Sequence, residues 1–248
     1  MTQPVIETNT LTKQYNDTIG IKNLDLVVKS GQVYGLLGPN GAGKSTIISL
    51  LSGYIHPNKG TARILDYDPW NNPVELHQRI GIVPDNVDIY KNLSARRHLS
   101  LAIETNGSGE DPIDLLEAVG LEAVADATAG EFSQGMKQRL VLAIALVNSP
   151  DILLLDEPFT GLDPHGVALI RKLITQKSNN GKTVLISSHR LNHIESLCDQ
   201  LGVIYRGTVV REGAPENLRK SLELSEEATL EDLVLELTGA DIRMSGVS

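Results

Sequence analysis

Cysteine is almost absent from this chain of 248 residues, in which Cys198 is the only one. A single cysteine excludes an internal disulfide, and this scarcity is typical of a reducing compartment such as the cytoplasm. We interpret Cys198 as a small buried apolar residue on a helix.

Long apolar runs are lacking as well. The longest, Leu140–Val147, is far shorter than the roughly 20 residues that a membrane-spanning helix needs. The first ten residues show no basic segment followed by an apolar one, so we expect no secretion signal. Any role at a membrane is therefore expected to depend on a partner.

Positive charge is scarce, because 22 lysines and arginines face 31 aspartates and glutamates. The net charge of −9 argues against a nucleic-acid partner held through phosphate contacts. Much of the acidity lies in residues 221–248, where seven acidic residues face one arginine. We interpret this tail as a solvated acidic element. A hydrophobic share of 41% and a charged share of 21% suit one soluble α/β domain.

The pattern of short apolar segments predicts a parallel sheet. Residues 1–37 are predicted to be rich in strands, and the run Val33–Leu37 leads into a glycine-rich loop and a helix over Thr46–Leu51. Further apolar strands are expected later in the chain, with helices between them. These are Ile152–Leu155, Val184–Ser187 and Leu201–Tyr205.

Residues 86–148 have a different sequence pattern, with helical signals and few strand signals. Ser94, the pair Asp111-Pro112 and Ser133 each favour the start of a helix. We interpret this stretch as a helical subdomain inserted into the core. A last helix is predicted at Thr229–Gly239, within an acidic C-terminal helical extension over 216–248.

The glycine-rich loop fits the pattern G-x-x-x-x-G-K-[ST]. Its glycines let successive backbone N–H groups converge on phosphate oxygens at the start of the following helix. Lys44 is expected to reach the β- and γ-phosphates, and the Ser45 hydroxyl is expected to bind Mg²⁺. A chance glycine-rich turn is the alternative. The segment reads Gly38, Pro39, Asn40, Gly41, Ala42, Gly43, Lys44, Ser45 and Thr46.

A second candidate group follows the apolar strand Ile152–Leu155. Asp156 and Glu157 come directly after it, and carboxylates are costly to bury, so we expect them at the open end of the strand. Asp156 is predicted to hold Mg²⁺ and Glu157 to polarise an attacking water. Two acids that merely begin a turn before Pro158 are the alternative.

A third segment, Phe132-Ser133-Gln134-Gly135-Met136, resembles the signature motif of the ATP-binding cassette family, usually written L-S-G-G-Q. In that family the Ser–Gly pair contacts the γ-phosphate bound by the other protomer. Gln134 and Met136 depart from the family pattern, while Ser133 and Gly135 are retained. Ser133 has a simpler interpretation as a helix N-cap.

The resemblance extends over roughly residues 5–215 and implies roles for further residues. Tyr15 matches the aromatic residue that stacks on adenine, and Asp163 lies in a segment similar to the family's D-loop. His189 matches the histidine that contacts the γ-phosphate. Asp85 stands where the family has a glutamine that binds Mg²⁺ and senses the transport subunit, so metal binding is expected to survive, whereas the coupling geometry is in doubt.

The resemblance implies an α/β fold with a P-loop NTPase core, a β-rich N-terminal part and an inserted helical subdomain. It implies an ATPase that uses ATP and Mg²⁺ in a nucleotide-binding domain over residues 1–215. It further implies a homodimer, or a pseudo-symmetric heterodimer, formed through ATP beneath integral membrane permease subunits at the cytoplasmic face of the membrane. The tail resembles exporter subunits for drugs, peptides, polysaccharides and bacteriocin immunity. The alternative is a soluble cassette ATPase of DNA maintenance or translation.

Overall fold

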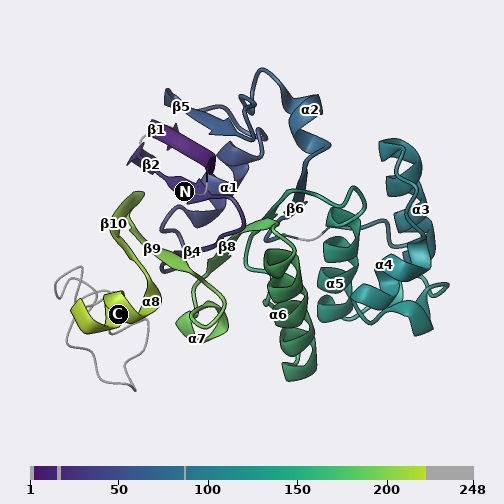
Figure 1. The fold of residues 1–248 in the computed structure, drawn as a ribbon. Coiled ribbons are helices and arrows are strands. Elements are labelled where there is room, and N and C mark those ends of the chain that lie inside the picture. Colours follow the sequence, from purple (N-terminus) through teal and green to yellow (C-terminus); the bar gives the residue numbers. More distant parts are fainter. Residues whose placement is uncertain (1–2, 16–17, 87, 222–248) are drawn as a thin grey trace.

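The computed structural model describes residues 3–15, 18–86 and 88–221. It contains two β-sheets with helices packed against them (Figure 1). The predicted helix Thr229–Gly239, and all but the first residues of the predicted extension 216–248, lie outside the described residues. Six of those first residues belong to the short helix α8, Pro215–Ser221.

The larger sheet has six strands in the order β10-β9-β4-β8-β7-β6. Its neighbours pair in parallel except β10, which runs antiparallel to β9. The parallel sheet predicted from the apolar runs is thereby confirmed. Its strands are β4 (Val33–Leu37), β6 (Ile80–Val83), β7 (Ile152–Leu155), β8 (Thr183–Ser188), β9 (Gln200–Tyr205) and β10 (Thr208–Gly213).

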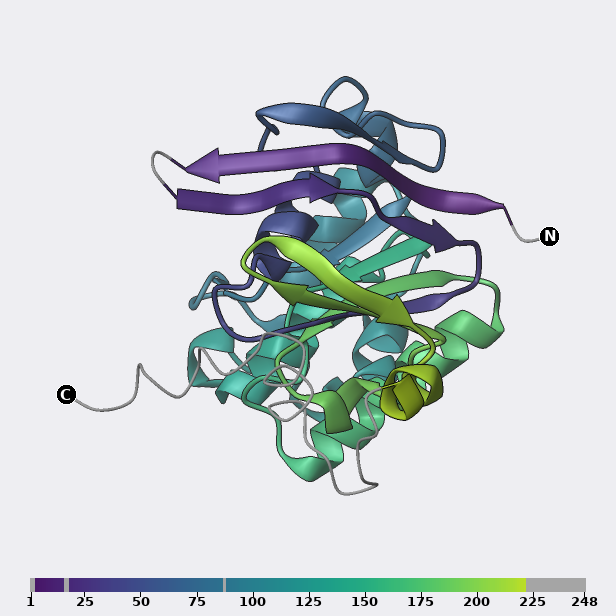
Figure 2. The same ribbon diagram turned by 90° about the vertical axis from the view of Figure 1, so that its left-hand side faces the viewer.

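A smaller antiparallel sheet lies over one face of the larger one (Figure 2). Its long strand β1 pairs with the other three, so the predicted β-rich N-terminal part is confirmed. Helix α1 lies between the two sheets, where Ile47 and Leu51 share an apolar core with Ile6 of β1 and Leu36 of β4. The strands are β1 (Pro4–Tyr15), β2 (Thr18–Leu24), β3 (Val27–Lys29) and β5 (Lys59–Ile64).

Helix α2 lies on the same side of the larger sheet as the smaller sheet, where its Leu76 joins the same apolar core, whereas the helices that follow it in the chain cover the opposite face or extend beyond the β6 edge (Figure 1). A second apolar core joins them to the sheet, for example Leu140 and Ile170 with Leu153 and Val184. The helices are α1 (Lys44–Leu51), α2 (Pro73–His77), α3 (Ala95–Asn106), α4 (Pro112–Ala118), α5 (Gln134–Ala145), α6 (Pro164–Asn179), α7 (Leu191–Ile194) and α8.

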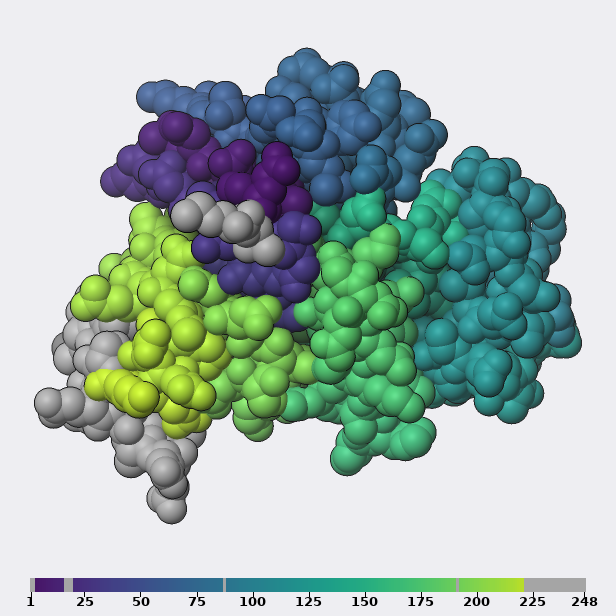
Figure 3. Space-filling model, in the orientation of Figure 1, coloured from purple at the N-terminus to yellow at the C-terminus, as the bar shows by residue number. Residues whose placement is uncertain are grey.

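The segment between β6 and β7 is helical, as its sequence predicts. Helices α3, α4 and α5 follow one another there and form a lobe beside the core (Figure 3). Each begins at a predicted cap, because the side chains of Ser94, Asp111 and Ser133 accept hydrogen bonds from backbone amides of the first turn. The exact limits of the predicted subdomain, residues 86 and 148, stay predictions.

Cys198 is buried, as expected, and burial raises the pKa of its thiol well above the usual range. The prediction that it lies on a helix is wrong. Helix α7 ends at Ile194, and Cys198 follows in the turn that leads into β9. The amide of Cys198 still donates a hydrogen bond to the Ile194 carbonyl at 3.0 Å, so the chain turns once more without continuing the helix.

Candidate functional site

The carboxyl ends of four parallel strands meet at one edge of the larger sheet. In the pairing register Leu37 lies beside Ser188, and Val83 lies beside Leu155. The glycine-rich loop, Asp85, the pair Asp156-Glu157 and His189 each follow one of these strand ends. Residues that are far apart in the sequence therefore converge at the edge where open α/β sheets bind ligands.

The glycine-rich loop connects the buried strand β4 to helix α1. Gly43 is the N-cap of α1, with a φ of 112° that side chains rarely adopt. A Cβ atom at Gly43 would lie 2.6 Å from the Gly20 carbonyl oxygen, so the loop has no room for a larger residue there. The N–H groups at the start of α1, together with the helix dipole, make this end of the helix suited to an anion.

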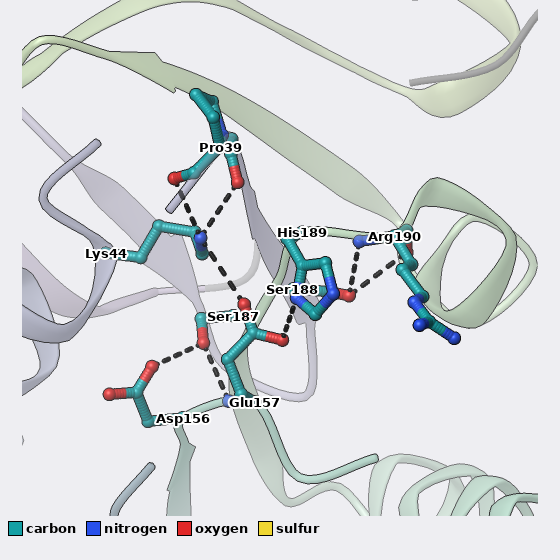
Figure 4. A network of polar contacts seen from close by, with 9 residues as sticks. Pro39, Lys44, Asp156, Glu157, Ser187, Ser188, His189 and Arg190 are labelled. Atoms are coloured by element: carbon teal, nitrogen blue, oxygen red, sulfur yellow. Dashed lines mark hydrogen bonds and ion pairs between the residues drawn. The ribbon is translucent and has the colours of Figure 1, made fainter. Parts of the chain in front are cut away.

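Lys44 points its ammonium group back into the loop (Figure 4). Its Nζ atom donates to the carbonyl oxygens of Gly38 at 2.8 Å and Pro39 at 3.2 Å. The same atom lies 3.3 Å from Oε1 of Glu157. The side chain is 5% exposed, so this positive charge is held almost out of water by groups that all accept hydrogen bonds.

Glu157 bridges Lys44 and His189. Its Oε2 atom lies 2.9 Å from Nδ1 of His189, within hydrogen-bond distance, while Oε1 faces Lys44 (Figure 4). The buried Oε1 accepts no hydrogen bond from the described residues, although the ion pair with Lys44 compensates its charge. Oε1 thus keeps capacity to accept a hydrogen bond.

Asp156 is the more buried of the two acids, at 4% exposure. Burial raises the pKa of Asp156 above its usual range, hydrogen bonds from Ser187 and Ser45 oppose this shift, and the negative charges of Asp85 and Glu157 add to it. The carboxylate therefore lies in a place where a positive charge would be stabilised. Ser45 and Asp85 are therefore close enough to Asp156 to influence the charge of its carboxylate.

A cavity of about 440 Å³ opens in front of these groups. Its volume falls in the range of small-molecule sites. Its wall includes the loop, Lys44, Glu157 and His189, together with Tyr15 and Asp85. The lining residues are Tyr15, Gly20, Asn40, Gly41, Gly43, Lys44, Ser45, Thr46, Asp85, Glu157, Thr160 and His189.

Tyr15 presents an aromatic ring to this cavity and is 44% exposed. The Lys13 ammonium lies 5.3 Å from the ring centroid, at cation–π distance. A ring that is partly exposed beside a phosphate-binding loop is available for stacking on a flat apolar group.

The predicted signature residues lie elsewhere. Among the described residues that line the cavity, none belongs to 133–135, and Asp163 is also absent from its wall. Ser133 is exposed and caps α5 through the Met136 amide, at 3.2 Å. Asp163 caps α6, because its Oδ1 atom accepts from the Gly166 amide at 2.8 Å. Both residues therefore have a structural role in this chain.

The signature segment nevertheless packs against the turn that contains Asp163. A Cβ atom placed on Gly135 would lie 2.9 Å from the Gly161 carbonyl oxygen, and one on Gly161 would lie 2.9 Å from Cγ of Gln134. Gly161 also has a φ of 75°, which favours glycine. The starts of α5 and α6 thus form one continuous surface beside the cavity.

The donor atoms at the site fit Mg²⁺. The described residues contain no group of three or more His, Cys, Asp or Glu side chains placed to hold a metal ion. Mg²⁺ bound with a nucleotide needs less from the protein, because one or two carboxylates and a hydroxyl complement the phosphate oxygens and water. Ser45, Asp156 and Asp85 supply that kind of oxygen donor.

Sequence reasoning missed Ser187. Its hydroxyl donates to Oδ1 of Asp156 at 2.6 Å and accepts from the Glu157 amide at 2.8 Å. The only sequence signal is that the apolar strand Thr183–Ser188 ends in two serines before His189. Thr160, which also lines the cavity, was not predicted either.

The chain matches known proteins over most of its length. The model of the family described as ABC transporter matches residues 21–160, more than half of the chain. Nod factor export ATP-binding protein I of Burkholderia orbicola is 42% identical over 223 residues, which cover 87% of this chain and 73% of that protein. Bacitracin transport ATP-binding protein BcrA of Bacillus licheniformis is 40% identical over 219 residues, covering 87% and 72%.

The fold also matches solved structures. The structure of an ATP-binding subunit of an ABC transporter superposes with a TM-score of 0.85 at 29% identity, covering 94% of this chain and 99% of that one. The predicted P-loop α/β core with its inserted helical subdomain is thereby confirmed. The chain belongs to the ABC transporter family, whose ATP-binding subunits it resembles in both sequence and fold.

Proposed function

We propose that this chain hydrolyses ATP in the presence of Mg²⁺ and thereby powers export of a substrate through a separate membrane permease. The observation that carries the proposal is the placement of Glu157 between Lys44 and His189 at the wall of the cavity. The transport part is supported by the relatives named above, which are an export and a transport ATP-binding protein. They disfavour the alternative in DNA maintenance or translation.

ATP binding follows from the glycine-rich loop and the Tyr15 ring, which line the same cavity. The adenine base stacks on Tyr15, while the phosphates lie on the backbone N–H groups between Gly38 and Thr46. Lys44 then exchanges its contacts with loop carbonyls and Glu157 for β- and γ-phosphate oxygens. Because the Lys44 side chain is almost completely buried, its attraction to phosphate is screened little by water.

Hydrolysis depends on the same exchange, in which Lys44 leaves Glu157 for the phosphates. Once Lys44 contacts phosphate, the Glu157 carboxylate is free to accept a hydrogen bond from a water molecule and to orient it toward the γ-phosphorus. His189 contacts Oε2 of Glu157 and fixes the carboxylate, and its other ring nitrogen is available to the γ-phosphate.

Mg²⁺ would be held by Ser45 and Asp156, with Asp85 contributing an oxygen directly or through water. It would neutralise charge on the β- and γ-phosphates as the bond between them breaks. The burial of Asp156 supports this assignment, because a buried carboxylate whose pKa is raised gains from a cation beside it.

Two cassettes are proposed to share each nucleotide. Ser133 and Gln134 are exposed at the start of α5, Gly135 beside them is half-buried, and all three lie outside the cavity of their own chain. A second cassette, either identical or a related one, brings them over the γ-phosphate and completes the site. Asp163 lies on the same continuous surface and faces the partner. ATP then holds the two chains together, since it contacts both.

The chain is expected to bind its integral membrane permease at the cytoplasmic face of the membrane. In the part of the chain that the structure describes, no helix combines the length and apolarity needed to cross a bilayer. Isolated from its own host in mild detergent, the chain should therefore carry a multispanning membrane protein that changes its ATPase rate. If the chain instead co-purifies with nucleic acid or ribosomes and with no membrane protein, the transport assignment is contradicted.

Asp85 offers a test of the metal assignment. We expect Asp85→Ala to leave ATP binding nearly unchanged and to reduce hydrolysis by about tenfold, because only one metal or water contact is lost. Asp85→Gln should retain most activity. Hydrolysis and binding are measured at saturating Mg²⁺, with Asp88→Ala as the control, an exposed aspartate of the same loop that does not line the cavity. Full activity of Asp85→Ala would show that Asp85 does not contribute to metal binding or hydrolysis.

A further inference from the structure

Ser187 connects Asp156 and Glu157 in the polar network beside the cavity (Figure 4). It is fully buried, near the end of β8, between the strands that carry the glycine-rich loop and the two acids. Its one hydroxyl proton goes to Oδ1 of Asp156 at 2.6 Å. Its oxygen accepts the backbone N–H of Glu157 at 2.8 Å. The hydroxyl thus joins the side chain of one acid to the backbone of the next.

The backbone of Glu157 needs such a contact. Its φ is 47°, in the left-handed region that a residue with a long side chain rarely adopts. Backbone strain of this kind persists only where surrounding contacts impose it, and it clusters at functional sites. The bond from the Glu157 amide to Ser187 is one of those contacts, and the conformation turns the carboxylate toward Lys44 and His189.

The contact to Asp156 is equally specific. The Asp156 carboxylate is 4% exposed, so its charge depends on neighbouring donors. A hydroxyl that donates at 2.6 Å fixes both the position and the rotation of the carboxylate. Since the same oxygen accepts the Glu157 amide, this hydroxyl of β8 links the orientation of the Asp156 carboxylate to the backbone of Glu157.

We propose that Ser187 is a positioning residue for ATP hydrolysis. Its hydroxyl holds the Asp156 carboxylate and the Glu157 backbone in a fixed orientation relative to each other. This inference rests on the proposed function, in which Asp156 serves the metal and Glu157 serves the attacking water. Ser187 does not touch the nucleotide. Its loss should therefore affect the chemical step and leave nucleotide binding unchanged.

The test compares Ser187→Ala with Thr183→Val in the full chain. Thr183 is a buried hydroxyl at the other end of the same strand, where it accepts the Gly31 amide at 3.0 Å. Ser187→Ala loses the two hydrogen bonds to the acids, whereas Thr183→Val loses a hydrogen bond to a backbone amide far from them. We expect Ser187→Ala to lower kcat by about tenfold, the usual effect of one lost hydrogen bond to a charged group. Its KM should change less than threefold, and Thr183→Val should keep the parental kcat.

Two further measurements make the result decisive. Fluorescent-ATP binding without turnover should be the same for Ser187→Ala and the parent. Ser187→Thr, which keeps the hydroxyl, should recover most of the lost kcat. If the added methyl group unfolds this variant, the comparison of Ser187→Ala with Thr183→Val still tests the inference. A kcat of Ser187→Ala within twofold of the parent, or an equal loss in Thr183→Val, would overturn the inference. A parent chain that does not hydrolyse ATP would instead overturn the proposed function.

Discussion

Replacing Glu157 with glutamine is expected to reduce ATP hydrolysis by about a thousandfold, within the usual contribution of a general base. Glutamine has nearly the same shape but no negative charge, so it orients water poorly and cannot take its proton. Lys44 loses its ion pair at 3.3 Å and becomes more available to phosphate. ATP affinity should consequently stay the same or increase. Phosphate release and equilibrium nucleotide binding measure the two effects separately.

A matched change on the surface serves as the control for this prediction. Glu104 on α3 also pairs with a basic residue, Arg97, but its side chain is 62% exposed and lies outside the cavity. Glu104→Gln should hydrolyse ATP as fast as the parent. If Glu157→Gln stays within tenfold of the parent, another group activates the water. If it fails to bind ATP, Glu157 has a binding role in place of a catalytic one.

Replacing Ser133 with arginine is expected to abolish the ATP-dependent dimer and, with it, nearly all hydrolysis. Ser133 is exposed at the start of α5 and outside the cavity of its own chain. A long charged side chain there would enter the space that the partner's nucleotide occupies in the proposed dimer. Light scattering on Glu157→Gln should show a dimer with ATP and a monomer with ADP. Adding Ser133→Arg should leave a monomer with either nucleotide.

The loss of a helix cap must be separated from the blocked interface. Ser133→Ala and Ser94→Ala remove equivalent cap bonds, each 3.2 Å long, at the starts of α5 and α3. Each should cost about 1 kcal/mol of stability, while Ser94→Ala should still form the ATP dimer. A Glu157→Gln chain that binds ATP tightly but stays monomeric at high concentration would contradict the shared site. Dimerisation of the Ser133→Arg variant would exclude the signature segment from the interface.

Local chemistry explains which features the sequence predicts correctly. The loop before Lys44 needs only a strand end, glycines that permit a left-handed backbone and a helix start, all within a dozen residues. The caps at Ser94 and Asp111 depend on a side chain and an amide two or three residues away. The buried strand Ile152–Leu155 is an uninterrupted apolar run. Each signal is complete within its own segment, so no knowledge of the fold is required.

Cys198 shows where this local reasoning stops. A buried thiol and a nearby helix were both predictable, but the helix ends at Ile194. The packing of Cys198 against the sheet, where a Cβ atom at Gly35 would lie 2.8 Å from its Sγ atom, decides where the chain must turn. Tertiary contacts of this kind override local helical preference.

The sequence by itself determined the family pattern, the phosphate loop and the identity of the two acids. Only the tertiary structure decided that Glu157 contacts Lys44 and His189, and that Ser187 joins it to Asp156. These contacts require β8 to lie between β4 and β7, although β5, β6 and the helices α1 to α5 intervene between β4 and β7 in the sequence. The order of strands in a sheet depends on how whole elements pack, which no local pattern contains.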